Sequence, residues 1–168
     1  MVRWDRLFAD LEGQAADVEL EERDALVSEL RDGAWAETSW RELVGGQVVL
    51  EVAGVGRVEG VAQLVNDRVV HLASERSEVV VAAAAVLEVV SSEQRASAPS
   101  AVTSRLGWGH VFRAARDDGD RAIVTRTDGA SVEGTVDVVG QDFVTLRTSA
   151  GRSRTVPFAA VAVLSFSA

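Results

Sequence analysis

The sequence predicts a mixed α+β fold, mainly of β-strands, in which one long helix precedes two small β-modules. The prediction rests first on an internal repeat, because residues 48–72 align with residues 122–146 without a gap. After one inserted residue the match continues to residues 90 and 166. Shared landmarks are Val58-Glu59-Gly60 with Val132-Glu133-Gly134, and Val65, Val70 and Leu72 with Val139, Val144 and Leu146. Each copy, of about 45 residues, is small for an independent core and should pack on a neighbour.

The second observation is the order of segments along the chain. We expect an N-terminal amphipathic helix in residues 1–37, a first module in residues 38–90, a linker in residues 91–103 and a second module in residues 104–168. The linker is rich in serine and alanine and contains Pro99, a composition typical of connections.

The N-terminal helix is predicted over residues 4–31, with Asp32-Gly33 as its stop. Its apolar residues recur at spacings of three and four: Trp4, Phe8, Leu11, Ala15 and Val18. Two interpretations remain open. The helix could cover a face of the sheet, or residues 4–31 could pair with another protein chain, because the seam approximates heptads for two repeats.

Each module is expected to begin with a short helix and to continue with five short strands. The first helix starts near Ser39, with Glu42 completing a capping box, and the second covers residues 106–115. The expected strands are residues 48–52, 58–65, 68–72, 79–82 and 87–90, and then residues 123–127, 132–139, 142–148, 154–158 and 162–166. Asp128-Gly129 between two alternating segments is a strong hairpin signal.

A short helix followed by five strands, with Gly60 or Gly134 inside the second strand, resembles the Sm-like fold of the LSm and Hfq proteins. The resemblance implies two Sm-like or SH3-like five-stranded barrels, in which the glycine lets a long strand bend. The opening residues 3–8 also resemble actinobacterial proteins of unknown role.

The chain departs from that family at its RNA-contacting positions. The family places an aspartate six residues after the strand glycine, where this chain has Asn66 and Gly140. At the junction of the fourth and fifth strands the chain has Ala82-Ala83 and Pro157-Phe158 instead of a basic residue with glycine or histidine. The resemblance therefore does not carry the family's base-binding pocket to this chain.

Composition argues against catalysis and cofactors. The absence of cysteine excludes disulfides, thiolate metal sites and cysteine nucleophiles. The two histidines, His71 and His110, have no metal-ligand spacing, and the aspartates of residues 117–120 lack the EF-hand pattern. We expect no enzyme, no cofactor and no metal; a hydrolase using His110 and an aspartate ranks last among the alternatives. Without a long apolar segment, the chain is expected in the cytoplasm and not in a membrane.

The distribution of charge along the chain allows an RNA-binding site only in the second module. Residues 1–47 carry 12 acids and 5 arginines, a net charge of −7, whereas arginines gather in the second module. Arginines on a helix and nearby turns could hold phosphates, and an aromatic side chain could stack on a base. The candidate RNA-binding residues are Arg105, Trp108, Arg113, Arg116, Arg121, Arg147, Arg152 and Arg154.

Assembly is the stronger inference. Residues 79–90 and 155–166 carry little charge for strands that would lie at the edges of small sheets, which natural proteins normally protect. We therefore expect one pairing between the repeats of a chain and another between chains, giving an intrachain pseudo-dimer or a homo-oligomeric ring. The candidate interface residues are Val79, Val81, Val89, Val156, Phe158, Val163 and Phe166. The expected function is an oligomeric scaffold or adaptor; the alternative is an RNA-binding regulator.

Overall fold

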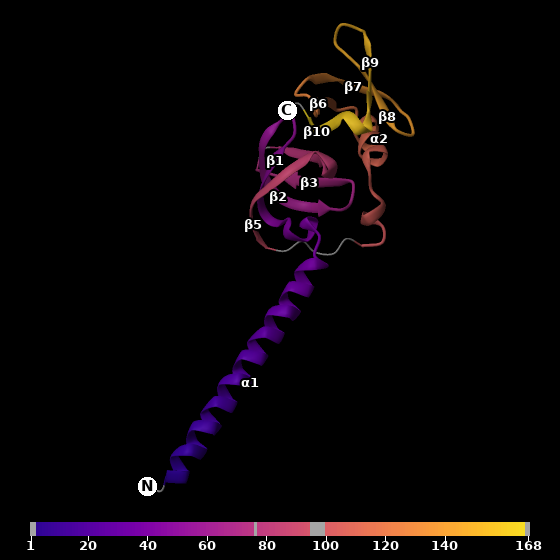
Figure 1. Cartoon of the computed structure of the whole chain (residues 1–168). Helices are drawn as coiled ribbons and strands as arrows, with labels where there is room; N and C mark the ends of the chain where they lie inside the picture. The colour runs from indigo at the N-terminus through magenta and orange to yellow at the C-terminus, as the bar shows by residue number, and fades with distance from the viewer. Residues whose placement is uncertain (1–2, 76, 95–99, 167–168) are drawn as a thin grey trace. The chain divides into compact units, whose positions relative to one another are not determined.

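The computed structural model describes residues 3–75, 77–94 and 100–166, and divides the chain into two units, Met1–Ser39 and Trp40–Ala168. The first unit is one continuous helix, α1 (Arg3–Ala36) (Figure 1). The helix was predicted, but its predicted stop at Asp32-Gly33 is wrong. A side chain at Gly33 would have open space around it, so this glycine lowers helix propensity without forcing a turn.

The second unit contains ten described strands, which are all joined in one antiparallel sheet. They are β1 (Gly45–Val52), β2 (Gly56–Val65), β3 (Val69–Ala73), β4 (Glu78–Ala82), β5 (Val86–Gln94), β6 (Arg121–Arg126), β7 (Ser131–Val139), β8 (Phe143–Arg147), β9 (Ser153–Pro157) and β10 (Val161–Phe166). The helical elements are η1 (Trp40–Leu43), η2 (Ala83–Ala85), η3 (Thr103–Arg105), α2 (Trp108–Asp118) and η4 (Phe158–Ala160). The expected first short helix is thus a single 3₁₀ turn, η1.

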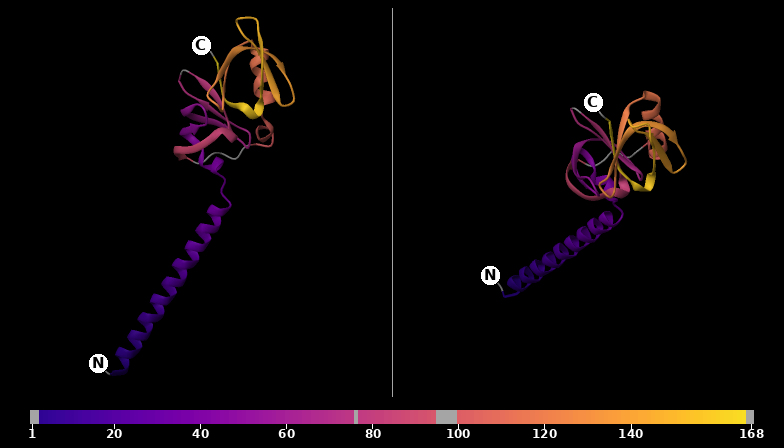
Figure 2. Two further views of the ribbon diagram at one scale, coloured as in Figure 1. Left: turned by 45° about the horizontal axis from the view of Figure 1, so that its top comes forward. Right: turned by 90° about the horizontal axis from the view of Figure 1, so that it is seen from above.

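The strand order repeats. It runs β5-β1-β2-β3-β4 through the first half of the sheet and β10-β6-β7-β8-β9 through the second half, so both halves place their fifth strand beside their first. Figure 2 shows these halves as two strongly curved groups of strands side by side. The mixed α+β class is confirmed. Two closed barrels are not confirmed, because the sheet is open and β5 and β9 each have a single neighbour.

The expected linker is shorter than predicted. Residues 91–94 extend β5, and residues 100–105 form a turn and η3, so neither end of the 91–103 segment is an irregular connection. Residues 95–99 lie outside the described part of the chain.

The two strand glycines occupy matching places in the sheet. Gly60 lies opposite Val48 on β1, and Gly134 lies opposite Ala122 on β6. In both halves the pairing of the second strand with the third shifts register two residues later, at a bulge. A side chain at Gly60 would lie 3.0 Å from the carbonyl oxygen of Ala73, and one at Gly134 would overlap the carbonyl oxygen of Arg147. Both strands therefore need glycine for close backbone approach.

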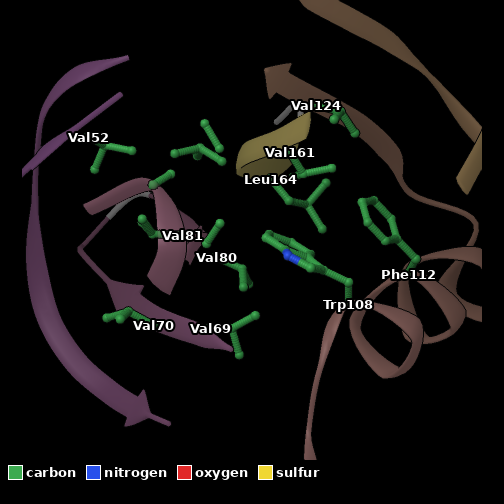
Figure 3. Close-up of a cluster of buried hydrophobic side chains, with 14 of the residues drawn as sticks. Val52, Val69, Val70, Val80, Val81, Trp108, Phe112, Val124, Val161 and Leu164 are labelled. Atoms are coloured by element: carbon green, nitrogen blue, oxygen red, sulfur yellow. The ribbon is translucent and has the colours of Figure 1, made fainter. Parts of the chain in front are cut away.

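One continuous hydrophobic core fills both halves. It is built mainly from valine and leucine on alternate strand positions, which suits half-buried strands. Its largest fully buried side chain is Phe112 of α2. Figure 3 shows the Trp108 ring, from the same helix, lying between Val80 of the first half and Leu164 of the second. Trp108 of α2 thus lies where the two halves meet.

The glycine contacts predict unequal effects of two equivalent substitutions. Gly134→Ala should lower the free energy of unfolding by about 2–3 kcal/mol, because the new methyl group must displace backbone, and Gly60→Ala by about 1 kcal/mol. Urea unfolding of both variants measures this difference. Equal, negligible effects would show that close approach is not what these glycines provide.

Candidate functional site: the inter-half joint and the open edges

We define the inter-half joint as the pairing of β4 with β10 and the side chains packed around it. Three residue pairs form it: Val81 with Val163, Val80 with Leu164, and Val79 with Ser165. Val81 and Leu164 are fully buried. The expected pairing between the two repeats is therefore present, and it explains why these strands carry so little charge.

Asn66 ties the second half to the first. It lies in the β2–β3 turn and is the one buried polar residue among those whose burial the structure describes. Its amide nitrogen donates to the carbonyl oxygens of Thr103 and Leu106, each at 2.9 Å, and its side-chain oxygen accepts from the backbone N–H groups of Arg68 and Val69 at 2.8 and 2.9 Å. The side chain thus fixes both its own turn and the segment leading into α2.

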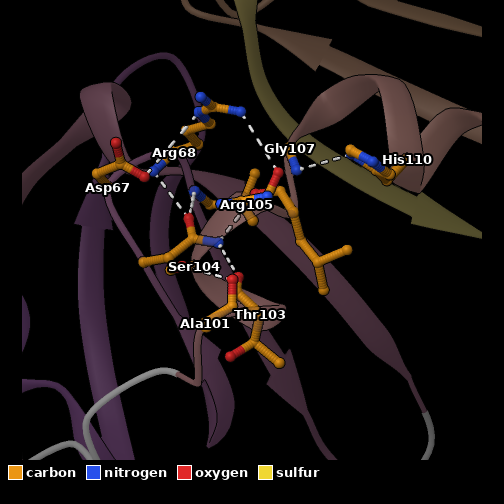
Figure 4. A network of polar contacts seen from close by, with 11 residues as sticks. Asp67, Arg68, Ala101, Thr103, Ser104, Arg105, Gly107 and His110 are labelled. Atoms are coloured by element: carbon orange, nitrogen blue, oxygen red, sulfur yellow. Dashed lines mark hydrogen bonds and ion pairs between the residues drawn. The ribbon is translucent and has the colours of Figure 1, made fainter.

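A second contact supports the same segment. The Arg68 guanidinium donates to the carbonyl oxygen of Arg105 at 3.4 Å (Figure 4). A side chain at Gly107 would come within 3.1 Å of the Arg68 Cδ, so the helix start is pressed against this arginine. The β2–β3 turn therefore supports the segment that leads into α2.

Trp108 belongs to the hydrophobic core around the joint. Its side chain is buried, its ring lies 5.5 Å from that of Phe112, and Phe112 in turn stacks on Phe158 at 5.7 Å. This packing disfavours the expected stacking of Trp108 on a base, because most of the ring is covered by other core side chains. The sequence signal for stacking was an aromatic residue at the start of a short, arginine-rich helix.

The first hairpin tips of the two halves also touch. Gly54 has a φ of 72°, and a side chain there would lie 2.5 Å from the Thr127 carbonyl oxygen and 2.6 Å from the Gly129 nitrogen. Arg126 donates to Asp128 in the same tip, and this hydrogen bond lowers the pKa of the Asp128 carboxyl to about 2. The predicted Asp128-Gly129 turn thus has a second role as a contact with the first half.

The open edges are the unpaired sides of β5 and β9. Strand β5 pairs only with β1, and this ladder contains three register shifts. The side chains of Leu87 and Val90 on β5 are 71% and 48% exposed. Strand β9 pairs only with β8, and every residue in it except Val156 is exposed. An exposed edge with apolar side chains is a template for pairing with another strand.

The expected interface residues therefore divide into two groups. Val79, Val81 and Val163 lie in the inter-half joint. Of the other four, Val89 and Val156 lie on the open edge strands β5 and β9, where each is paired on one side only, with Leu50 and with Val144. Phe158 stacks on Phe112, and Phe166 pairs with Ala122.

The expected RNA-binding arginines are dispersed and partly neutralised. Three of them form ion pairs with carboxylates of the same chain: Arg116 with Asp117 at 3.0 Å, Arg121 with Glu133 at 2.9 Å, and Arg147 with Asp137 at 2.7 Å. Arg105, Arg113, Arg152 and Arg154 are exposed on four different segments: η3, α2, the β8–β9 turn and β9. Such an arrangement weakens a phosphate-binding site, because each nearby carboxylate repels phosphate.

Helix α1 exposes apolar side chains in the part whose side chains are described. Leu20, Leu26, Val27 and Leu30 are each more than half exposed. The segment expected to meet a protein partner, residues 4–31, thus presents apolar surface at least over its second half. Exposed apolar residues on a helix are typical of a contact surface.

The two histidines have structural partners. His71 lies 3.6 Å from the carboxylate of Glu78, and His110 accepts a hydrogen bond from the Gly107 N–H at 3.4 Å. Within residues 3–75, 77–94 and 100–166, no group of three or more histidines and acids is arranged to hold a metal ion. In that same part of the chain, every helix is too short or too polar to span a bilayer.

Comparison with known proteins adds no relative. No family model matches the chain, and neither the curated proteins nor the solved structures contain a significant match. The function must therefore be argued from the geometry of the joint, the edges and the surface.

The Asn66 contacts predict that this residue is needed to hold the halves together. Asn66→Ala should lower the free energy of unfolding by about 2–3 kcal/mol, because two N–H groups and two carbonyl groups lose their partner. Urea unfolding measures this, with Asp67→Ala as the matched control, since the Asp67 side chain is exposed. Equal stability of the two variants would contradict the role of Asn66.

Proposed function

We propose that the chain is a non-enzymatic, tandem Sm-like module that assembles into an oligomeric scaffold or adaptor. In this proposal β5 of one chain pairs with β9 of the next. The observation that carries it is the inter-half joint, which is already a pairing of a fourth strand with a fifth strand of the other repeat. The two open edges, β9 and β5, are the fourth strand of the second half and the fifth strand of the first half. The acidic helix α1 would remain available to a protein partner.

The repeat gives the register of the proposed contact. Because Val81 aligns with Val156, and Val86 with Val161, the partners of the joint can be transferred from one repeat to the other. The joint pairs Val81 with Val163, Val80 with Leu164 and Val79 with Ser165. The equivalent pairs between chains are Val156 with Glu88, Thr155 with Val89, and Arg154 with Val90.

The side chains suit that register. Arg154 would lie diagonally across from Glu88 on the same face of the sheet, within reach of an ion pair. Pro157, which has no N–H to donate, aligns with Ala82, and the joint ends one residue earlier, at Val81. The proline therefore lies just beyond the proposed ladder and does not interrupt it.

The contact is heterologous, because each chain uses two different edges. Repeated contacts of this kind close into a ring when the rotation between chains allows closure, and otherwise form a filament.

Charge reversal at the proposed contact tests the assembly. Arg154→Glu should weaken each interface about three- to tenfold, because a like-charge pair with Glu88 replaces an attractive one. Arg154→Glu combined with Glu88→Arg should restore the wild-type particle mass. Sedimentation velocity over micromolar concentrations measures the masses. Wild-type chains that sediment only as monomers, or a double variant that is not rescued, would contradict the proposal.

RNA binding is the competing prediction, and the ion-paired arginines and the buried Trp108 speak against it. We expect labelled single-stranded RNA to bind weakly, with no change on Arg113→Ala plus Arg116→Ala. Binding at two salt concentrations measures this. An affinity that falls steeply with salt and is lost in the double variant would reverse the ranking, because it would reveal specific phosphate contacts.

A further inference from the structure

A cleft lies beside the inter-half joint, between α2 of the second half and strands β2–β4 of the first. Its volume is about 420 Å³, within the range typical of small-molecule sites. Apolar side chains form much of its lining: Leu64, Val69, Val80, Leu106, Val111 and Phe166. These residues come from both halves, so the cleft exists only because the joint holds the halves together.

The charged groups of the described residues that line the cleft all have one sign. Glu78, Asp118 and Asp120 are exposed acids among these lining residues, which include none of the described arginines. Asp118 is also the last residue of α2, where the helix dipole places partial negative charge. The cleft therefore combines an apolar lining with a negative potential, and it attracts cations and repels anions.

We propose that this cleft binds an organic cation with an apolar chain, such as an alkylammonium ion. The alkyl chain would displace water from the apolar lining, and the ammonium group would lie beside acids of that lining. A hydrated metal ion fits the cleft less well. The described residues hold no cluster of three suitable ligands, and the apolar side chains of the lining cannot coordinate a metal ion. The proposal is independent of the proposed assembly, since all lining residues belong to one chain.

The two histidines provide a site-specific readout. His71 and His110 are the only histidines of the chain, and both line the cleft. Their ring signals in an NMR titration therefore report on the cleft without background from other histidines. Hexylammonium should shift both signals saturably, whereas hexanoate, of similar length and opposite charge, should not.

Variants in the cleft sharpen the test. Asp118→Asn plus Asp120→Asn should weaken hexylammonium binding about tenfold, because two exposed attractive charges are removed. Ala114→Trp should abolish binding by filling the cleft, since Ala114 is exposed on its wall. Asp117→Asn is the matched control, because Asp117 neighbours Asp118 on α2 but does not line the cleft.

A free amine and a lysine side chain share this chemistry. Titration with N-acetyl-lysine methylamide distinguishes them: binding of hexylammonium alone supports a free amine, and binding of both supports a lysine residue as the occupant. The proposal is overturned if hexylammonium leaves the histidine signals unchanged, or if hexanoate shifts them equally. It is also overturned if Asp118→Asn plus Asp120→Asn binds as the Asp117→Asn control does.

Discussion

The pairing of β4 with β10 is the constraint on which the rest of the second unit depends. Only three residue pairs form this ladder, yet it converts two five-stranded groups into one continuous sheet and one continuous core. A half of this size would bury a small core by itself. The pairing also determines which strands remain at the ends of the sheet. It joins the fourth strand of the first half, β4, to the fifth strand of the second half, β10, so the fifth strand of the first half, β5, and the fourth strand of the second half, β9, are the end strands.

Side chains from outside the sheet stabilise this joint. Asn66 binds the backbone that precedes α2, and α2 then places Trp108 at the boundary between the halves, with Phe112 packed beside it. A buried amide with all its hydrogen bonds made favours one arrangement over others, because each alternative leaves polar groups without partners. The cleft beside α2 is a consequence of the same arrangement.

Much of the fold could be predicted from the sequence because its signals are local. The alignment of the repeats, the alternation of valines and the Asp128-Gly129 turn located the strands to within a few residues. Gly60 and Gly134 marked the positions of close backbone approach. The pairing of one fourth strand, β4, with one fifth strand, β10, could also be predicted, since apolar edge strands are rarely left without partners.

The parts that could not be predicted depend on contacts between distant segments. Asn66 has the sequence signature of an ordinary turn residue, and its burial follows only when Thr103 and Leu106, 37 and 40 residues later, come to lie against it. Trp108 was expected to be available for base stacking because its helix is rich in arginine, and its packing on Phe112 follows only from the tertiary structure. The cleft could not be predicted because its lining residues belong to segments that are distant in the sequence and are brought together by the joint.

Pairing of β5 with β9 between chains is tested most directly by disulfide trapping, since the chain has no cysteine of its own. Val90→Cys and Arg154→Cys, introduced together, place two thiols directly opposite each other in the proposed register. Mild oxidation should then link chains into covalent oligomers, whereas Val90→Cys with Thr155→Cys, on opposite faces, should link far less. Monomers only, or equal linking by both pairs, would contradict the proposed assembly.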